Sequence, residues 1–329
     1  MTSSDADPRP VTPQDAWEAL LTLDSPTEQR HPGTADLDTL GAEGLVRTIL
    51  GADAAVVTAV QALAQPLAGL VEACVGTIAA GGTVHSVGAG TSGRLAVLDA
   101  AELGPTFNAG SDLFRAHLAG GDAAMLVAVE GAEDSAEAGA QVVAEQVRDG
   151  DLVIGVAASG RTPYVRGALE AARSRGLVTA LISANPAAPL ASLADHALLA
   201  DVGPEVVTGS TRMKAGTAQK LLLNALSTAT MVRLGKTYSN LMIDVRPSNE
   251  KLVARTVRML VQASGAQPER AHRVLEEAGG SVRIALVALL ADAEVPAARS
   301  AAERFLPDPA RSGDPAGIRA AVEALRRHG

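Results

Sequence analysis

Two short segments of this sequence combine glycines with hydroxyl side chains in a pattern that can bind an anion. The first is Gly88-Ala89-Gly90-Thr91-Ser92-Gly93-Arg94, the second is Ala158-Ser159-Gly160-Arg161-Thr162-Pro163, and both contain Ser-Gly-Arg. Each follows an apolar run typical of a strand and precedes a helical pattern. Glycines allow a close approach of backbone to ligand, and the first N–H groups of a helix lack intrahelical partners. The two segments therefore predict a phosphate site made of backbone amides and hydroxyls.

The first segment also fits G-x-G-x-x-G, the pattern of a dinucleotide site, through Gly88, Gly90 and Gly93. That kind of site needs an acidic residue about 20 positions further on, at the end of the next strand. Asp112 lies near that distance but precedes the candidate strand. The hydroxyl pair and the second segment favour a monophosphate instead. The chain contains no G-x-x-x-x-G-K-[ST] segment, which excludes a P-loop.

Two glutamates are candidates for acid–base chemistry. Glu102 ends the helical pattern that the first segment opens, and Glu130 follows an apolar run over 123–129. Their apolar neighbours predict a partly desolvated cleft, where burial raises a carboxyl pKa toward neutral pH. The alternative for any single glutamate is a solvated surface charge, and Glu133 and Asp134 fit that alternative better.

The third glycine-containing segment, the histidines and the serines give weaker indications of a functional site. A third segment, Thr208 to Ala218, opens a long apolar helical pattern with hydroxyls, glycines, an arginine and Lys214, which is typical of a ligand loop or a tight packing turn. The six histidines show no metal-ligand spacing with one another or with Cys74, so we predict no metal site and no cofactor. His85 is expected to be a buried core histidine. Without a G-x-S-x-G segment, a nucleophilic serine is disfavoured.

Between residues 81 and 199 short apolar runs alternate with helical patterns. Strands are predicted at 83–87, 113–118, 152–157, 177–182 and 197–200, and helices at 92–103, 123–129, 135–147 and 162–174. The predicted helix over 92–103 is stopped by Gly104-Pro105. Strands alternating with helices predict the α/β class, with a parallel sheet covered on both faces.

The flanking regions are helical or irregular. Residues 1 to about 40 predict an arm with little regular structure, followed by helices over 41–50 and 53–80, the second capped by Asp53 and kinked at Pro66. Helices over 213–234 and 249–263 precede a tail of short helices. We divide the chain into an N-terminal arm and helix (1–60), a catalytic domain (61–263) and a C-terminal helical domain (264–329).

Composition excludes several classes of function. The chain has 329 residues, a net charge of −9 and only 2% aromatic residues. Base-stacking readers of nucleic acid need rings, and an acidic chain binds polyanions poorly, so no nucleic-acid partner is expected. The sequence contains no run of 18 apolar residues and no signal-peptide pattern, which predicts a cytoplasmic protein without a membrane partner. The single cysteine, Cys74, is expected to be buried.

Six motifs of this sequence together resemble the N-acetylmuramic acid 6-phosphate etherase family. They are Thr27 to Pro32, Val87 to Arg94, Ala100 to Glu102, Val129 to Asp134, Ala158 to Val165, and Val207 to Lys220. The resemblance runs from about Thr27 to the end of the chain. It implies a sugar isomerase (SIS) fold, in which a parallel five-stranded sheet lies between helices, and a ubiquitin-associated-like helical tail. It also implies a homodimer and cleavage of the D-lactyl ether of the substrate with water, giving N-acetylglucosamine 6-phosphate and D-lactate.

The resemblance implies an acid–base pair at Glu102 and Glu130. The predicted substrate- and phosphate-binding residues are Gly90, Thr91, Ser92, Gly93, Arg94, Ser159, Gly160, Arg161, Thr162, Glu205, Ser210 and Lys214. The sequence departs from the family pattern at three places, with His31 for a usual Asn, Leu103-Gly104 for a common Cys-Pro and Asn108 for a common Gly. None of these removes a proposed catalytic group.

An ether is a poor leaving group, and elimination becomes easier once the sugar ring opens. The C1 aldehyde acidifies the C2 proton, a base removes it, an acid protonates the departing lactate, and water adds to C3. We assign Glu102 as the acid and Glu130 as the base. The alternatives are an aldose–ketose isomerase or amino-sugar deaminase of the same fold, and a non-catalytic sugar-phosphate-binding regulator. No helix-turn-helix pattern precedes the sugar domain, which argues against a DNA-binding regulator.

Overall fold

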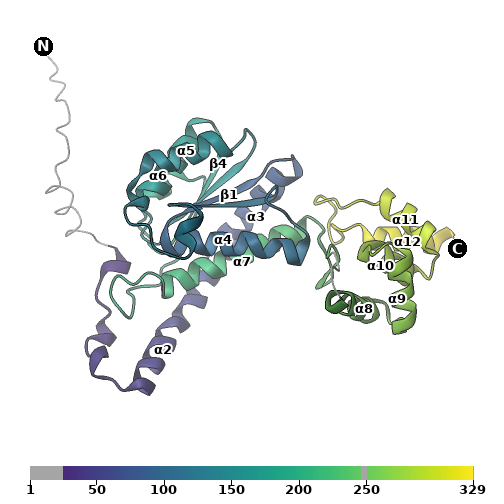
Figure 1. The fold of residues 1–329 in the computed structure, drawn as a ribbon, viewed down its shortest axis with the longest axis horizontal. Helices are drawn as coiled ribbons and strands as arrows, with labels where there is room; N and C mark the ends of the chain where they lie inside the picture. Colours follow the sequence, from purple (N-terminus) through teal and green to yellow (C-terminus); the bar gives the residue numbers. More distant parts are fainter. Residues whose placement is uncertain (1–24, 246–249, 329) are drawn as a thin grey trace, which may run out of the picture.

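The computed structural model describes residues 25–245 and 250–328 and contains one five-stranded parallel sheet (Figure 1). Its strands are β1 (Val84–Gly88), β2 (Phe114–Leu118), β3 (Leu152–Val156), β4 (Val178–Ser183) and β5 (His196–Leu199). The spatial order is β2-β1-β3-β4-β5, so the strand order reverses between β1 and β3. Every residue of β1 and β3 is buried, as a sheet covered on both faces requires. The predicted class and the five predicted strands are confirmed.

Two layers of helices enclose the sheet (Figure 1). One face packs against α3 (Ala64–Ala79), α4 (Gly90–Phe107) and α7 (Lys214–Arg233), around an apolar core that includes Leu70, Ile154 and Leu222. The other face packs against α5 (Ala136–Gln146) and α6 (Pro163–Ser174). The predicted helices over 135–147, 162–174 and 213–234 are confirmed to within a few residues.

The helices α5 and α6 cross at two glycines. A Cβ atom on Gly139 would lie 1.9 Å from the carbonyl oxygen of Tyr164, and one on Gly167 would lie 1.9 Å from that of Ala136. Only a residue without a side chain allows the two backbones to approach this closely. The small residues of this region therefore determine how α6 lies on the sheet.

The N-terminal helices differ from the prediction in where they break. Instead of helices over 41–50 and 53–80, the structure contains α2 (Ala42–Gln61) and α3, bent by 61° relative to each other. Asp53 lies inside α2 and caps nothing. Pro66 occupies the first turn of α3, where the missing N–H has no intrahelical partner to lose. No single described helix is long and apolar enough to cross a membrane; by length and composition only the bent pair α2–α3 qualifies.

One predicted helix end and one predicted helix were wrong. The helix α4 continues through Gly104-Pro105 to Phe107, because Gly104 has no side chain to clash with the proline ring. It ends at Asn108, whose left-handed conformation (φ 49°) is one that asparagine tolerates. The helix expected over 123–129 is only a short 3₁₀ turn (Asp122–Met125), and the apolar Leu126 is 92% exposed. An apolar run does not form a helix when nothing covers it.

The described part of the N-terminal arm, from Ser25, contains only 3₁₀ turns: Pro26–Glu28, Pro32–Thr34 and Leu37–Thr39. Two hydrogen bonds attach it to the segment before α7. The hydroxyl of Thr34 donates to the Val206 carbonyl at 3.0 Å, and the Gly209 amide donates to the Thr27 carbonyl at 3.2 Å. The arm therefore packs against the third segment identified in the sequence.

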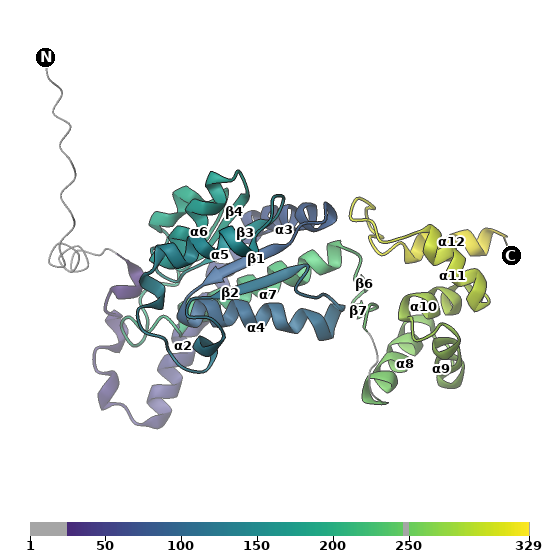
Figure 2. The same ribbon diagram turned by 45° about the horizontal axis from the view of Figure 1, so that its top comes forward.

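Five helices form a separate C-terminal group, seen in Figure 2 beyond the short β6 (Thr237–Tyr238) and β7 (Leu241–Met242). They are α8 (Glu250–Ser264), α9 (Pro268–Glu277), α10 (Val282–Ala291), α11 (Val295–Arg304) and α12 (Ile318–His328). Their own core includes Leu260 of α8 as well as Leu286 and Ile318. Because α8 packs into this core, the helical unit begins before residue 264, where the sequence placed its boundary.

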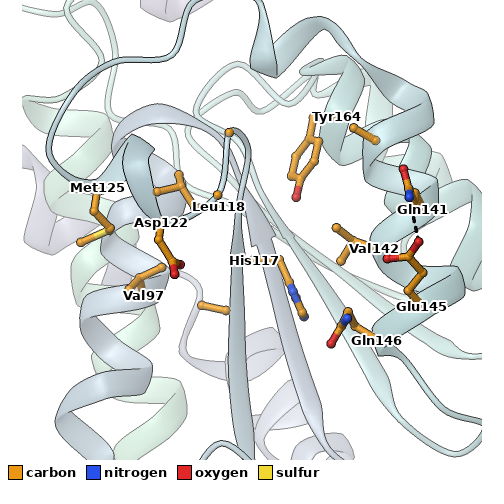
Figure 3. Close-up of a pocket in the computed structure, with 14 residues that line it drawn as sticks. Val97, His117, Leu118, Asp122, Met125, Gln141, Val142, Glu145, Gln146 and Tyr164 are labelled. Carbon is orange, nitrogen blue, oxygen red and sulfur yellow. Dashed lines mark hydrogen bonds between the residues drawn. The ribbon is translucent and has the colours of Figure 1, made fainter.

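Two histidines and an aspartate form a buried polar network between β1, β2 and the start of β3. Nε2 of His85 lies 3.1 Å from Oδ2 of Asp151, and its Nδ1 lies 2.9 Å from Nε2 of His117. His85 and Asp151 are almost fully buried, while His117 lines an open pocket of about 410 Å³ beside α5 (Figure 3). The expected buried His85 is confirmed, and Cys74 is likewise buried, which raises its thiol pKa to about 12.

This network makes folding stability depend on pH. Burial lowers the pKa of His117 from 6.5 to about 4, and burial also lowers that of His85 although Asp151 opposes the shift. Because both pKa values are lower in the folded state, the unfolded chain binds these protons first as the pH falls below 6.5. We expect the Tm to decrease between pH 6.5 and 4.5 in scanning calorimetry.

Replacing His117 by Gln is expected to remove a large part of that pH dependence. The matched control is His272→Gln, because His272 is exposed on α9 and its replacement is expected to leave the dependence unchanged. An unaltered Tm profile in His117→Gln would contradict the assignment.

Candidate active site

The two glycine–hydroxyl segments lie next to each other at the carboxyl edge of the sheet. One connects β1 to α4 and the other connects β3 to α6, and Gly88 pairs with Val156 at the ends of these two strands. The chain continues to opposite sides of the sheet after β1 and β3. A crevice forms in open α/β sheets where the strand order reverses in this way, and ligands bind there.

The N-terminus of α4 is open to an anion. The residue that precedes its first turn is Ala89, which has no side-chain oxygen to accept from the free amides. Gly90 adopts φ +53°, and a Cβ atom on Gly93 would lie 2.5 Å from the carbonyl oxygen of Gly88. The glycines thus bring the helix end close to β1 and leave its amides available.

The N-terminus of α6 has a similar arrangement. Thr162 precedes the helix, but its hydroxyl makes no capping hydrogen bond to the first turn. Gly160 has φ +66°, and a Cβ there would approach Ala188 to 2.3 Å. The backbone carbonyl of Ser159 accepts from Asn185, which follows β4. Nε of Arg161 is buried and has no hydrogen-bond partner among the described residues.

Glu130 lies beside the N-terminus of α4. It lines a cavity of about 200 Å³ together with Gly90, Arg94 and Glu133. The Glu130 side chain is exposed, in a turn that continues through Gly131 with φ +74°. Nε of Arg94 donates to the Ala124 carbonyl at 2.8 Å, which attaches the loop containing Glu130 to the first turns of α4. Arg94 therefore contacts this loop and lines the same cavity as Gly90 and Glu130.

Glu102 lies elsewhere in the same chain. It is exposed on α4, twelve residues after Gly90, which places it about 18 Å further along the helix axis at 1.5 Å per residue. A five-residue strand is of similar length, about 16 Å, so Glu102 lies near the opposite edge of the sheet. A single chain does not bring Glu102 and Glu130 together, and the expected desolvated cleft around both is not present in it.

The third segment is closed to an anion by a glutamate that lies shortly before it in the chain. Glu205 is fully buried, and its two carboxylate oxygens accept from the amides of Lys214 and Ala215 at 2.9 Å each. The Lys214 ammonium is buried and donates to the Val202 carbonyl at 2.6 Å. Glu205 thus satisfies the first turn of α7, and Lys214 is anchored within the protein. Ser210 is partly exposed.

Sequence reasoning missed two residues that contact these loops. Asn185 follows β4 at the same edge of the sheet as the loops, and its side chain donates to Ser159. A polar residue two positions after a buried strand was a signal that could have identified it. Gln219 contacts Ser92 from within α7. Nothing in its local pattern distinguishes it from other residues of a helix.

Comparisons with known proteins agree with this geometry. Residues 66–173 match the family described as the glucokinase regulatory protein N-terminal SIS domain, and residues 126–229 match the SIS domain. The parallel sheet flanked by helices is therefore a SIS fold, as the resemblance implied.

Several curated relatives share close to half of their residues with this chain. The N-acetylmuramic acid 6-phosphate etherase of Symbiobacterium thermophilum is 52% identical over 265 residues, which cover 80% of this chain and 88% of the relative. The proteins of the same name from Rubrobacter xylanophilus and Deinococcus radiodurans are each 50% identical, over 80% of this chain and 88% and 87% of the relatives. At this identity and coverage, the chain belongs to the N-acetylmuramic acid 6-phosphate etherase family.

Proposed function

We propose that this chain is a carbon–oxygen lyase that cleaves the D-lactyl ether of N-acetylmuramic acid 6-phosphate, in the recycling of cell-wall amino sugars. The observation that carries the proposal is the cavity where the open N-terminus of α4 and the Glu130 loop meet, in a member of this family. A charged sugar phosphate does not cross membranes unaided, which is consistent with the cytoplasmic location predicted from the sequence.

The 6-phosphate binds between the two glycine–hydroxyl loops in this proposal. The free amides of Gly90, Thr91 and Ser92 and the hydroxyls of Ser159 and Thr162 supply donors, and the positive ends of two helix dipoles face the anion. Nε of Arg161 is buried without a hydrogen-bond partner among the described residues, which supports a place for this side chain beside the crevice. The net negative charge of the chain does not prevent binding, because helix N-termini can bind a single phosphate without a basic patch.

The reaction then proceeds by elimination and hydration. Glu130 removes the C2 proton of the open-chain aldehyde, and the resulting enolate expels the lactate oxygen from C3. Glu102 gives that oxygen its proton, so D-lactate leaves with the ether oxygen. Water then adds to C3 and a proton returns to C2, giving N-acetylglucosamine 6-phosphate. Two carboxyl groups in opposite protonation states carry out these transfers.

We further propose that the enzyme is a homodimer in which each site takes its two glutamates from different copies. Within one chain Glu102 and Glu130 lie at opposite edges of the sheet, too far apart for one sugar. On α4 the exposed Leu98 lies one turn from Glu102, and Leu126 and Val127 are exposed close to Glu130. A second copy that covers these apolar side chains would desolvate both carboxylates.

The proposal is tested by incubating the purified chain with N-acetylmuramic acid 6-phosphate in H₂¹⁸O and, separately, in D₂O. We expect unlabelled D-lactate, one ¹⁸O atom at C3 of the sugar product and one deuterium at C2, by mass spectrometry and NMR. A ketose product would instead indicate an isomerase. Binding of the sugar phosphate without turnover would indicate a regulator, and ¹⁸O in lactate would exclude cleavage at the C3–O bond.

A further inference from the structure

Ser92 and Gln219 form a buried contact between the first turn of α4 and the second turn of α7. Ser92 is 7% exposed and Gln219 is 1% exposed. The Ser92 hydroxyl donates to Oε1 of Gln219 at 3.0 Å. Three residues before Gln219, Gly216 also faces α4, since a Cβ there would lie at van der Waals distance, 3.4 Å, from Cγ2 of Thr91. Gln219 therefore lies directly behind the phosphate loop proposed above.

The other end of this amide has no partner. Nε2 of Gln219 is buried and makes no hydrogen bond with any residue that the structure describes. A buried amide that has lost water without gaining an acceptor costs free energy. In the same arrangement the Ser92 proton points toward α7 and away from the loop, so the hydroxyl has no proton to offer a phosphate.

Turning the amide by 180° about its Cγ–Cδ bond keeps the contact with Ser92, frees the Ser92 proton and places the oxygen instead of the NH₂ group at the position without a partner. Nε2 then donates to the hydroxyl oxygen of Ser92, and the amide oxygen occupies the position without a partner. A buried carbonyl oxygen is less costly to leave unpaired than an N–H group. The Ser92 proton is released to point out of the α4 N-terminus.

We propose that Gln219 is a positioning residue whose amide donates to Ser92 and so directs the Ser92 hydroxyl proton to a phosphate oxygen of the bound sugar phosphate. The inference rests on the proposed function in one respect, that a phosphate occupies the N-terminus of α4. Gln219 does not touch the substrate in this proposal. It determines whether the Ser92 hydroxyl can donate to the phosphate.

The same helix pair contains a polar contact that serves as a control. Further along the interface, the Ser227 hydroxyl of α7 hydrogen-bonds to Asp99 of α4, and both residues are buried. That contact lies about two turns from the loop. If the Ser92–Gln219 contact only held the helices together, removing either contact would have the same consequences.

The experiment compares Gln219→Glu, Ser92→Ala, the double variant Ser92→Ala/Gln219→Glu and Ser227→Ala in the full chain. The Kd of N-acetylglucosamine 6-phosphate is measured by titration calorimetry, and KM and kcat by D-lactate release. A carboxylate at position 219 only accepts, so it holds the Ser92 proton. Gln219→Glu is therefore expected to raise the Kd at least about tenfold, with a larger change in KM than in kcat.

Three comparisons make the result specific. In the Ser92→Ala background, Gln219→Glu is expected to raise the Kd by less than about threefold, since its effect passes through Ser92. Ser227→Ala is expected to stay within about twofold of the wild type. The neutral Gln219→Met tests the amide without adding charge and is expected to raise the Kd about threefold or more. Thermal unfolding of each variant verifies that it is folded.

An equal loss of affinity in both backgrounds would show that charge at position 219 acts directly on the phosphate, and would overturn the inference. So would a wild-type Kd in Gln219→Met and Gln219→Glu. If the wild type binds the sugar phosphate but releases no D-lactate, the proposed function fails, while the Kd values still decide the role of Gln219. If the wild type does not bind it, both proposals fail.

Discussion

Glu130→Gln and Glu102→Gln are each expected to lower D-lactate release by at least about 1000-fold, since each removes one of the two proposed proton-transfer groups. In D₂O, Glu130→Gln should also lose exchange at C2 of the sugar, whereas Glu102→Gln keeps exchange because it retains the base. Glu133→Gln is the matched control, as Glu133 lines the same cavity as Glu130. It is expected to stay within about threefold of the wild type.

Mixing the two inactive variants tests where the glutamates come from. If each site takes Glu102 from one copy and Glu130 from the other, half of a random mixture is heterodimers. Each heterodimer then has one intact site and one doubly altered site, so about a quarter of the wild-type activity returns. Co-expression with two different affinity tags supplies the heterodimer. No recovery of activity in a verified heterodimer would show that both carboxylates belong to the same chain.

Gly139→Ala is expected to lower the free energy of unfolding by about 3 kcal/mol or more. The added Cβ atom would lie 1.9 Å from the Tyr164 carbonyl oxygen, so the α5–α6 pair must separate and the packing of α6 on β3 is lost with it. Urea denaturation measured by circular dichroism checks the value. A fall in soluble expression is expected at the same time, and Gly139→Val should not fold.

The control for this substitution is Gly76→Ala in α3. Gly76 is an exposed helical residue, and a Cβ atom there would meet nothing within 4 Å. Because alanine restricts the unfolded chain more than glycine does, Gly76→Ala is expected to stabilise the protein by about 0.5–1 kcal/mol. A Gly139→Ala variant as stable as the wild type would contradict the close packing of α5 and α6.

The sheet and its loops were predictable because their signals are local. Apolar runs of five or six residues followed by glycine and hydroxyl residues fit strands that end at a ligand site, and all five strands lie within a few residues of their predicted positions. Local sequence patterns gave wrong helix predictions where tertiary packing decides whether a helix forms or ends. Pro105 is tolerated in α4 because Gly104 precedes it, and residues 126–129 stay outside a helix because nothing packs over them.

The candidate site was only partly predictable for the same reason. Ser92, Ser159 and Thr162 follow strands directly, so the topology brings them to one edge. Glu102 is separated from that edge by most of the length of α4, a distance that the predicted helix over 92–103 already implied and that the interpretation of the two glutamates as one cleft did not take into account. The contacts of Gln219 with Ser92 and of His117 with His85 join residues far apart in the chain. No spacing rule relates such residues.

Glu205 has a consequence for how many anions the site can accommodate. The first turn of α7 lies beside that of α4, where Gly216 approaches Thr91, so three helix N-termini gather near the crevice. A buried carboxylate already occupies the third, and its charge repels any other anion there. In the proposed site, the N-termini of α4 and α6 therefore remain for one phosphate. We expect a second phosphate placed near Glu205, as in a sugar bisphosphate, to be rejected by like charge and not by lack of room.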